Sequence, residues 1–398
     1  MASATAIFLR EFFFMKFSLS ILYITVFVFL LSCSKKTDHT PIVQKPIPQN
    51  LPNTVDVTDT LKVIAYNVLN YGNGCQGSTA ALDAYLKTIV QYAQPDLLSC
   101  EKMAAFIPTA GSPSNLAEDI TTNALNAAFP GKYAYATPTN AVAATTMSVL
   151  FYNKSKLTLV KTETILANIT DFNLYKLYYN DPNLAITHDT TFLYVLVNHT
   201  QSGSSSTARD IQVSSIMQNL RAKFGYFPNL ISMGDFNTHN SLEAGYQSMI
   251  ASADTATKMS DPPFYPDKTV SYPAEWENNT SLFASFLTTT TRALATVPNS
   301  CGTAGGAKSW YDHILISPWL VNGTNYLKYV PKSYQTIGND GNRTGVDINS
   351  QTPAINSSAP PAVIDALFQF SDKYPIAIKL FVKANRNAYS VADPAEKN

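Results

Sequence analysis

Residues 61–69 read LKVIAYNVL, and the folded part of the chain is expected to begin near this run. Its apolar and β-branched residues are typical of a buried strand. Helical patterns, with apolar residues every three or four positions, occur between later strand-like runs. Strands interleaved with a few helices predict a layered α/β domain, and the helical stretches are too few for a (β/α)8 barrel. The further strand-like runs are 96–100, 147–152, 192–199, 230–233, 311–316 and 374–382, and the helical patterns are 79–92, 115–129 and 211–224.

Polar side chains stand at the ends of these apolar runs. A single Asp after a strand often forms a turn. Repetition of the pattern from strand to strand instead favours a site where the strand ends meet. The residues concerned are Asn67 inside the first run, Glu101 directly after DLLSC, His199 at the end of FLYVLVNH, Asp235 and Asn237 in the string GDFN, and Asp312 before HILIS.

The chemistry of these groups suits a hard cation and a phosphate. Glu101 with Asn67 offers the oxygen ligands that Mg²⁺ prefers, and Mg²⁺ usually takes only one or two protein carboxylates. Neither Cys nor His occurs in a spacing suited to zinc. Asp235 and Asn237 share one side of an extended strand end, so Asp235 could polarise a water while Asn237 holds a phosphate oxygen.

The ordered set of motifs resembles the endonuclease/exonuclease/phosphatase family of divalent-metal phosphoesterases. The resemblance covers residues 61–383. It implies a DNase I-like fold, a four-layer α/β/β/α sandwich, with the site at the strand ends between two sheets. The matching segments are VIAYNVLNYG, PDLLSCEKM, VNHTQSG followed by Arg209 and Gln212, GDFN at 234–237 and YDHILIS at 311–317.

The family's residue roles carry over by position. The resemblance implies that Glu101 holds Mg²⁺ or Mn²⁺ with support from Asn67. It implies that His199 and Asn237 bind the scissile phosphate of a phosphate-ester substrate. Asp235 would orient or deprotonate the attacking water. Asp312 would steady a histidine in the family's last motif, Ser-Asp-His-x-Pro.

The last motif departs from the family, because residues 371–375 read SDKYP and Lys373 replaces the histidine. Lysine is a protonated point charge at neutral pH, so it neutralises charge on phosphorus but is a poor base. Three outcomes stay open. Lys373 serves as an electrostatic clamp, or His313 substitutes although strand alternation aims it away from Asp312, or hydrolysis is lost and binding kept. The retained Glu101 and GDFN favour an active phosphodiesterase or nuclease-like hydrolase over a catalytically impaired, ligand-binding or partner-binding lipoprotein.

Composition limits the partners. The 28 Lys and Arg residues balance the 28 Asp and Glu residues, and charged residues make up 14% of the 398. No general electrostatic attraction to nucleic acid is built into such a surface, so any phosphate contact must come from a local site. The 45% hydrophobic content excludes disorder for most of the chain. We expect a monomer.

The first residues predict export. Residues 17–32, FSLSILYITVFVFLLS, follow Met15 and Lys16 and end before Cys33, which is typical of a signal segment whose cysteine is lipidated. The alternative is an uncleaved transmembrane anchor, for which the run is short. We therefore expect a lipoprotein of the bacterial cell envelope, bound to a membrane through its N-terminal lipid. The predicted parts are a signal segment at 1–33, a flexible tether at 34–60, the domain at 61–385 and a tail at 386–398.

Three cysteines remain in the domain. Cys75 and Cys301 lie in Gly-rich segments and could pair, whereas Cys100 ends an apolar run and is predicted to be buried. Residues 254–309 and 339–360 are rich in Thr, Ser, Pro and Asn. The first predicts a long insertion or surface loop beside the site, and the second another loop of this kind. For most of these residues, ordinary solvated connections are expected.

Overall fold

The computed structural model describes residues 51, 53–271, 275–281 and 283–386. The predicted signal segment 1–33 with its lipidation site Cys33, most of the predicted tether and residues 387–398 lie outside the described residues. Within the described part, no helix combines the length and hydropathy that crossing a bilayer requires.

Two β-sheets form the centre of the domain. The seven-stranded sheet has the order β10-β12-β1-β2-β4-β3, with β11 paired to β12, and the five-stranded sheet has the order β5-β6-β7-β8-β9. The first sheet contains β1 (Thr58–Tyr71), β2 (Leu97–Ala104), β3 (Tyr133–Ala136), β4 (Thr146–Asn153), β10 (Leu327–Tyr329), β11 (Gln335–Thr336) and β12 (Ile376–Lys383). The second contains β5 (Leu157–Ala167), β6 (Asp171–Tyr179), β7 (Phe192–His199), β8 (Leu230–Asp235) and β9 (Asp312–Ile316).

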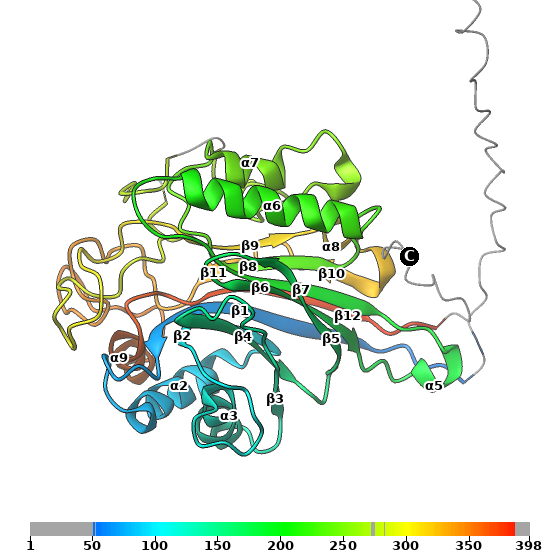
Figure 1. The fold of residues 1–398 in the computed structure, drawn as a ribbon, viewed down its shortest axis with the longest axis horizontal. Helices are drawn as coiled ribbons and strands as arrows, with labels where there is room; N and C mark the ends of the chain where they lie inside the picture. Colours follow the sequence, from blue (N-terminus) through cyan, green and yellow to red (C-terminus); the bar gives the residue numbers. More distant parts are fainter. Residues whose placement is uncertain (1–50, 52, 272–274, 282, 387–398) are drawn as a thin grey trace, which may run out of the picture. The chain divides into compact units, whose positions relative to one another are not determined.

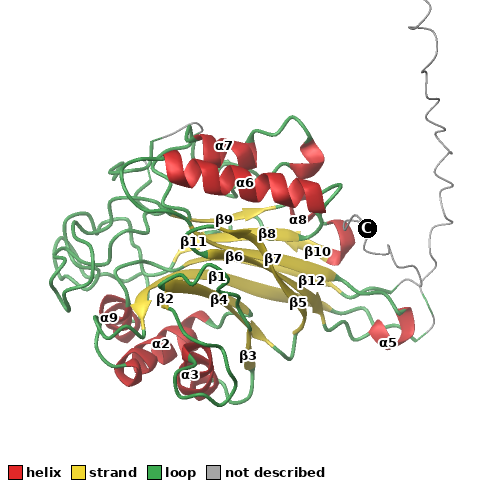
Figure 2. Ribbon diagram, in the orientation of Figure 1, coloured by secondary structure: helices red, strands yellow, loops and turns green. Residues whose placement is uncertain are grey.

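Helices cover the outer face of each sheet, as Figure 1 and Figure 2 show. The layer on the first sheet consists of α2 (Thr79–Ala93), α3 (Leu116–Asp119), the π-helical turn Ile120–Leu125, α4 (Asn126–Ala128) and α9 (Pro361–Phe370). The layer on the second contains α6 (Thr207–Lys223) and α7 (Ala244–Ile250). The shorter α5 (Leu184–Thr187) and α8 (Pro318–Asn322) lie near the strand ends. The predicted four-layer α/β/β/α sandwich is confirmed.

The sequence explains the helical layer over the first sheet. Leu82, Leu86, Ile89 and Val90 recur at helical spacing in α2, and all of them are buried. Ser78 caps the helix by accepting a hydrogen bond from the backbone N–H of Ala81. The helix therefore presents one continuous apolar face to the sheet.

The folded domain begins before the predicted boundary at residue 61. Strand β1 starts at Thr58. Upstream of it, the backbone N–H of Val55 donates to Oδ1 of Asn183 at 2.8 Å, and Nδ2 of Asn183 donates back to the Val55 carbonyl at 2.8 Å. The end of the predicted tether is thus attached to the domain.

Residues 254–309 were predicted to be an insertion or surface loop beside the site, and the expectation of a solvated surface position is wrong for their middle part. Trp276 and the segment 288–292 are buried. Backbone hydrogen bonds join this segment to the SDKYP motif at 371–375. The N–H of Thr291 donates to the Asp372 carbonyl at 3.0 Å, and the N–H of Tyr374 donates to the Thr288 carbonyl at 2.9 Å. Backbone pairing makes burial of these polar residues tolerable, which composition alone does not reveal.

A disulfide joins Cys75 to Cys301, with a Cα–Cα distance of 5.8 Å. It links the loop after β1 to the loop that approaches Asp372, since Thr303 donates from its N–H and its hydroxyl to Oδ2 of Asp372. Cys100 is buried and free, as predicted.

Candidate active site

The register of strand pairing places the predicted polar residues side by side on neighbouring strands of each sheet. Asn67 on β1 is paired with Glu101 on the parallel strand β2. On the other sheet, His199 on β7 is paired with Asp235 on the parallel strand β8. Asp235 is also opposite Asp312 on β9. Each sheet thus gathers its own part of the site.

Contacts across the two sheets join these parts. Nδ2 of Asn67 donates to Oδ2 of Asp235 at 2.9 Å. Nζ of Lys373 is 3.2 Å from the same oxygen. Oδ1 of Asp235 accepts from the backbone N–H of Asn237 at 2.9 Å. Asp235 is therefore the centre of the cluster, and the predicted site residues Asn67, Glu101, His199, Asp235, Asn237, Asp312 and Lys373 lie together.

Glycine is required directly before Asp235. Gly234 has a φ of +133°, and a Cβ there would meet the Asn198 carbonyl oxygen at 2.0 Å. A side chain at this position would push β8 away from β7 and displace Asp235. Asn237 follows in the left-handed region, with φ 49°, and its Nδ2 donates to the Thr200 carbonyl at 3.0 Å.

Burial and mutual repulsion dominate the titration of two carboxyl groups. Burial, reinforced by Asp312 and Asp235 and opposed by a hydrogen bond from Ser99, raises the pKa of Glu101 well above its usual range. Burial and the neighbouring Asp235 raise the pKa of Asp312 from 3.8 to about 8. The positive charge near Glu101 and Asp312 is too small to offset the effect of burial and of neighbouring carboxylates on their pKa values.

Asp235 and His199 respond differently. Burial by itself would raise the pKa of Asp235, but Lys373 and His199 outweigh it and lower that pKa below 3.8. Burial lowers the pKa of His199 from 6.5 to about 4, although Asp235 opposes the change. Asp235 is thus ionised and His199 neutral at pH 7.

Lys373 points into the cluster. Its ammonium donates to Oγ1 of Thr289 at 2.7 Å and lies 5.0 Å from the ring centroid of Tyr311. Burial disfavours its charge, yet the carboxylates, Asp235 foremost, raise its pKa. The hydroxyl of Ser371 fixes the motif by accepting from the Lys373 N–H at 3.1 Å and donating to the Asn67 carbonyl at 2.7 Å.

His313 does not join the cluster, which corrects the possibility that it substitutes for the missing histidine. Its Nδ1 is 2.9 Å from Oδ2 of Asp261, and its ring packs against Trp276 and Trp310. Successive residues of a strand point to opposite faces, so His313 points away from the site that Asp312 faces.

Other residues near the motifs have supporting positions. Arg209 forms an ion pair with Glu243, at 2.8 Å between Nη2 and Oε1. Oε1 of Gln212 accepts from the Gln201 N–H at 2.9 Å. Sequence reasoning missed Thr289, which binds the ammonium of Lys373, because a threonine within a Thr-rich segment carries no positional signal.

The cluster suits a divalent cation. Oε2 of Glu101 and both carboxylate oxygens of Asp312 are buried without a hydrogen-bond partner. The cluster contains three carboxyl groups, those of Glu101, Asp235 and Asp312. Its one cationic side chain among the predicted site residues is Lys373. Across the described residues, no three Cys, His, Asp or Glu side chains are arranged as a ready-made metal site. Mg²⁺ with one or two protein ligands and several waters fits this donor set better than zinc does.

Comparisons with known proteins give structural likenesses only. No protein-family model matches the chain, and no curated protein matches it. Among solved structures, D. rerio TDP2 in complex with a single-stranded DNA product is 14% identical, covers 81% of this chain and 98% of its own, and has a TM-score of 0.49. An endonuclease/exonuclease/phosphatase family protein from Bacteroides thetaiotaomicron is 13% identical. The match covers 82% of this chain and 97% of that protein, with a TM-score of 0.45.

A mannosyl-6-phosphatase from the same species is 13% identical, covers 80% of this chain and 99% of its own, and has a TM-score of 0.44. Similar solved structures thus include members of the endonuclease/exonuclease/phosphatase family. At these identities and TM-scores, the likenesses assign neither a family nor an activity to this chain.

Proposed function

We propose that the chain is a divalent-metal-dependent phosphoesterase of the endonuclease/exonuclease/phosphatase family, anchored by lipid outside the cytoplasm. The observation that carries the proposal is the convergence on Asp235. Asn67 from the other sheet and Lys373 from the last motif both contact one of its oxygens, at 2.9 and 3.2 Å. Positions 67, 235 and 373 are far apart in sequence, and a structural role alone does not require their side chains to meet.

The residues divide the chemistry among them. Glu101, supported by Asn67, would hold Mg²⁺ or Mn²⁺, which would neutralise charge on the phosphoryl oxygens when bound. Asp235 stays ionised, so it would accept a hydrogen bond from the attacking water and orient it. Its lowered pKa makes it a weak base. Neutral His199 and the amide of Asn237 would bind phosphate oxygens.

Lys373 would act as an electrostatic clamp. Its charge is maintained by the surrounding carboxylates, so it neutralises a phosphate but does not take up a proton. Its contact with Asp235 would loosen as a phosphate arrives between the two groups. A family histidine would supply less fixed charge at this position, because an ordinary imidazole is mostly neutral at pH 7.

Hydrolysis of bis-p-nitrophenyl phosphate by the purified full chain, with Mg²⁺ or Mn²⁺, tests the proposal. We expect chelator-sensitive release of p-nitrophenol that Glu101→Ala abolishes. Asp365→Ala is the matched control, because it removes an exposed carboxylate from α9. Release that neither the chelator nor Glu101→Ala reduces would exclude this reaction.

Lys373 also motivates a second candidate, a catalytically impaired protein that binds a phosphorylated ligand or a partner. Its ammonium is already ion-paired with Asp235, the group that hydrolysis needs to orient water. Calorimetry with inorganic phosphate separates the candidates. Binding without turnover in the parent, together with turnover in Lys373→His, would favour the impaired form.

The anchoring part of the proposal rests on residues 17–33 of the sequence. Metabolic labelling with radioactive palmitate in a bacterial host tests it. We expect label in the parent and none in Cys33→Ser, whereas Cys100→Ser, which changes a buried thiol, should keep the label.

A further inference from the structure

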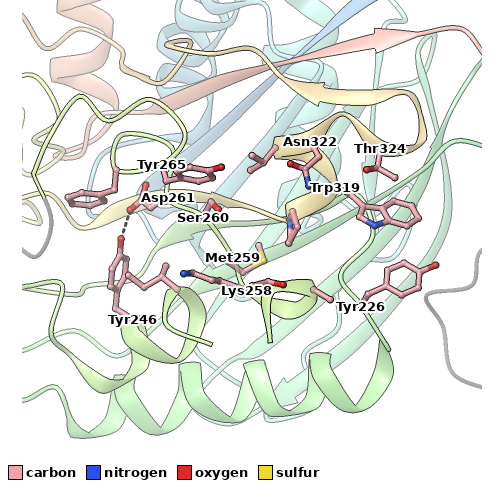
Figure 3. Close-up of a pocket in the computed structure, with 16 residues that line it drawn as sticks. Tyr226, Tyr246, Lys258, Met259, Ser260, Asp261, Tyr265, Trp319, Asn322 and Thr324 are labelled. Carbon is pink, nitrogen blue, oxygen red and sulfur yellow. Dashed lines mark hydrogen bonds between the residues drawn. The ribbon is translucent and has the colours of Figure 1, made fainter. Parts of the chain in front are cut away.

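A cavity of about 740 Å³ lies on the opposite side of β9 from the candidate active site. It is bordered by α7, the segment around 255–265 and α8. Figure 3 shows Asp261 and Tyr246 toward one end, and Trp319 and Tyr226 toward the other. Its volume falls within the range of small-molecule sites, roughly 300–1,000 Å³.

One end of the cavity contains a carboxylate with an oxygen that has no hydrogen-bond partner. Asp261 is 2% exposed. Its Oδ2 accepts from the hydroxyl of Tyr246 at 2.8 Å and is hydrogen-bonded to Nδ1 of His313 at 2.9 Å. Oδ1 has no hydrogen-bond partner. A buried carboxylate oxygen left without a donor is costly, so this end of the cavity suits a ligand that donates a hydrogen bond.

The other end of the cavity offers flat aromatic surface. The rings of Tyr226 and Trp319 stack with centroids 5.1 Å apart and planes 23° from parallel. Tyr265, which is 52% exposed, lies beside Asp261 at the opposite end of the cavity (Figure 3). Aromatic faces attract the C–H-rich face of a ring, and aromatic side chains contribute large contact areas.

Charge and polarity narrow the ligand class. The lining contains one lysine, Lys258, and one carboxylate, Asp261, so neither sign dominates. The exposed side chains of Asn322 and Thr324 add groups that both donate and accept hydrogen bonds. A neutral ligand with many hydroxyls and one apolar ring face satisfies all of these groups.

We propose that this cavity is a carbohydrate-binding site for a short, uncharged oligosaccharide. One sugar ring stacks on the surface formed by Trp319 and Tyr226, and a hydroxyl of another donates to Oδ1 of Asp261. The site is separate from the candidate active site and does not depend on the proposed hydrolysis.

Titration of the full chain with maltotriose, mannotriose and chitotriose tests this proposal, with tryptophan fluorescence and calorimetry as readouts. The chain has three tryptophans, so Trp319 contributes a sizeable part of the signal. We expect saturable binding of at least one sugar with a Kd below about 1 mM. Trp319→Ala and Asp261→Asn should each weaken it about tenfold or more.

The substitutions are chosen to leave the fold intact. In Asp261→Asn the amide oxygen can still accept from Tyr246 and His313, while an NH₂ group, which cannot accept, replaces Oδ1. Tyr92→Ala removes an exposed aromatic from α2 and is the matched control. Near-ultraviolet circular dichroism checks the packing of each variant.

Four results would overturn the proposal. One is the lack of any saturable binding up to about 10 mM sugar. Another is unchanged binding in a folded Trp319→Ala variant. A third is weakened binding in Tyr92→Ala, and the fourth is preference for adenosine or for a quaternary amine such as choline over all three sugars. Glu101→Ala should bind sugar as the parent does, which separates this site from the proposed hydrolysis.

Discussion

A buried carboxylate lies on each face of β9, and the surroundings of the two carboxylates differ. Asp312 faces the cluster between the sheets, where other carboxylates and Lys373 surround it and its pKa rises to about 8. On the other face, His313 meets Asp261, which also accepts from the hydroxyl of Tyr246. Charged side chains gather on the first face, whereas on the second the carboxylate is hydrogen-bonded to a tyrosine hydroxyl and an imidazole and lies near aromatic rings.

This difference indicates what each face can bind. A cluster with more carboxylates than cations stabilises an added cation and, through it, a phosphate. A carboxylate with one oxygen left without a partner favours a ligand that donates a hydrogen bond. The two faces should therefore respond independently to substitution.

The largest effect is expected from Asp235→Asn. It removes the charge that Lys373 and Asn67 contact, so we expect hydrolysis of bis-p-nitrophenyl phosphate to fall by about 10³ to 10⁴-fold. Sugar binding should not change. The mirror-image control is Asp261→Asn, which should weaken sugar binding and preserve hydrolysis. Loss of both functions in either variant would mean that the faces are coupled.

Metal addition gives the next largest effect. At a Mn²⁺ concentration one hundred times its Kd, binding to the native state alone should raise the free energy of unfolding by about 2.7 kcal/mol. Chemical denaturation with and without Mn²⁺ measures this increase. Glu101→Gln should remove most of it, and Asp261→Asn should leave it unchanged. Equal stabilisation of both variants would place the ion elsewhere.

The pH dependence of the unfolding free energy tests the surroundings of Asp312. Its pKa rises from 3.8 to about 8 in the metal-free native state, so the native state binds this proton more tightly than the unfolded state does. The resulting stabilisation is present below the lower value and is lost as the pH rises through the higher one. Asp312→Asn should therefore flatten the decline of the unfolding free energy between pH 6 and 8, by about 2 kcal/mol. Asp365→Asn is the control, and an unchanged decline in Asp312→Asn would contradict the expectation.

The smallest effect is expected at His313. If its imidazole took the place of the missing family histidine, substitution would greatly reduce hydrolysis. Because it faces Asp261 instead, we expect His313→Asn to keep the hydrolysis rate within about threefold of the parent, measured on the same ester. A loss comparable to that of Asp235→Asn would restore His313 as a catalytic candidate.

The sequence predicted the inner strands and the charged face well, for a physical reason. Central strands are covered on both sides, so they read as continuous apolar runs, and a polar residue such as Glu101 or Asp235 stands out at the strand end. The pairing order of the strands then brings the ends together. The exception among the inner strands is β6, which is largely buried but was not predicted, because Asn173 and Lys176 interrupt its apolar run. Strand β5 was not predicted either, because it lies at a sheet edge and its residues are mostly half-buried or exposed.

The second face could not be read from the sequence. Asp261 and Trp276 belong to a segment without apolar periodicity, whose path is fixed by hydrogen bonds to distant residues. Trp276, for example, donates from its N–H to the His239 carbonyl at 3.2 Å. Contacts of this kind depend on the assembled sandwich, and local patterns do not encode them.

Because Asp312 and His313 are consecutive, the spacing of β9 assigns one side chain to each compartment. Deleting a single residue of β9 after His313, with the pairing of the rest of the strand to β8 kept, would turn Asp312 to the face that His313 now occupies and His313 to the opposite face. Insertions and deletions at this strand should thus be far more damaging than point substitutions, since one length change disables both compartments at once.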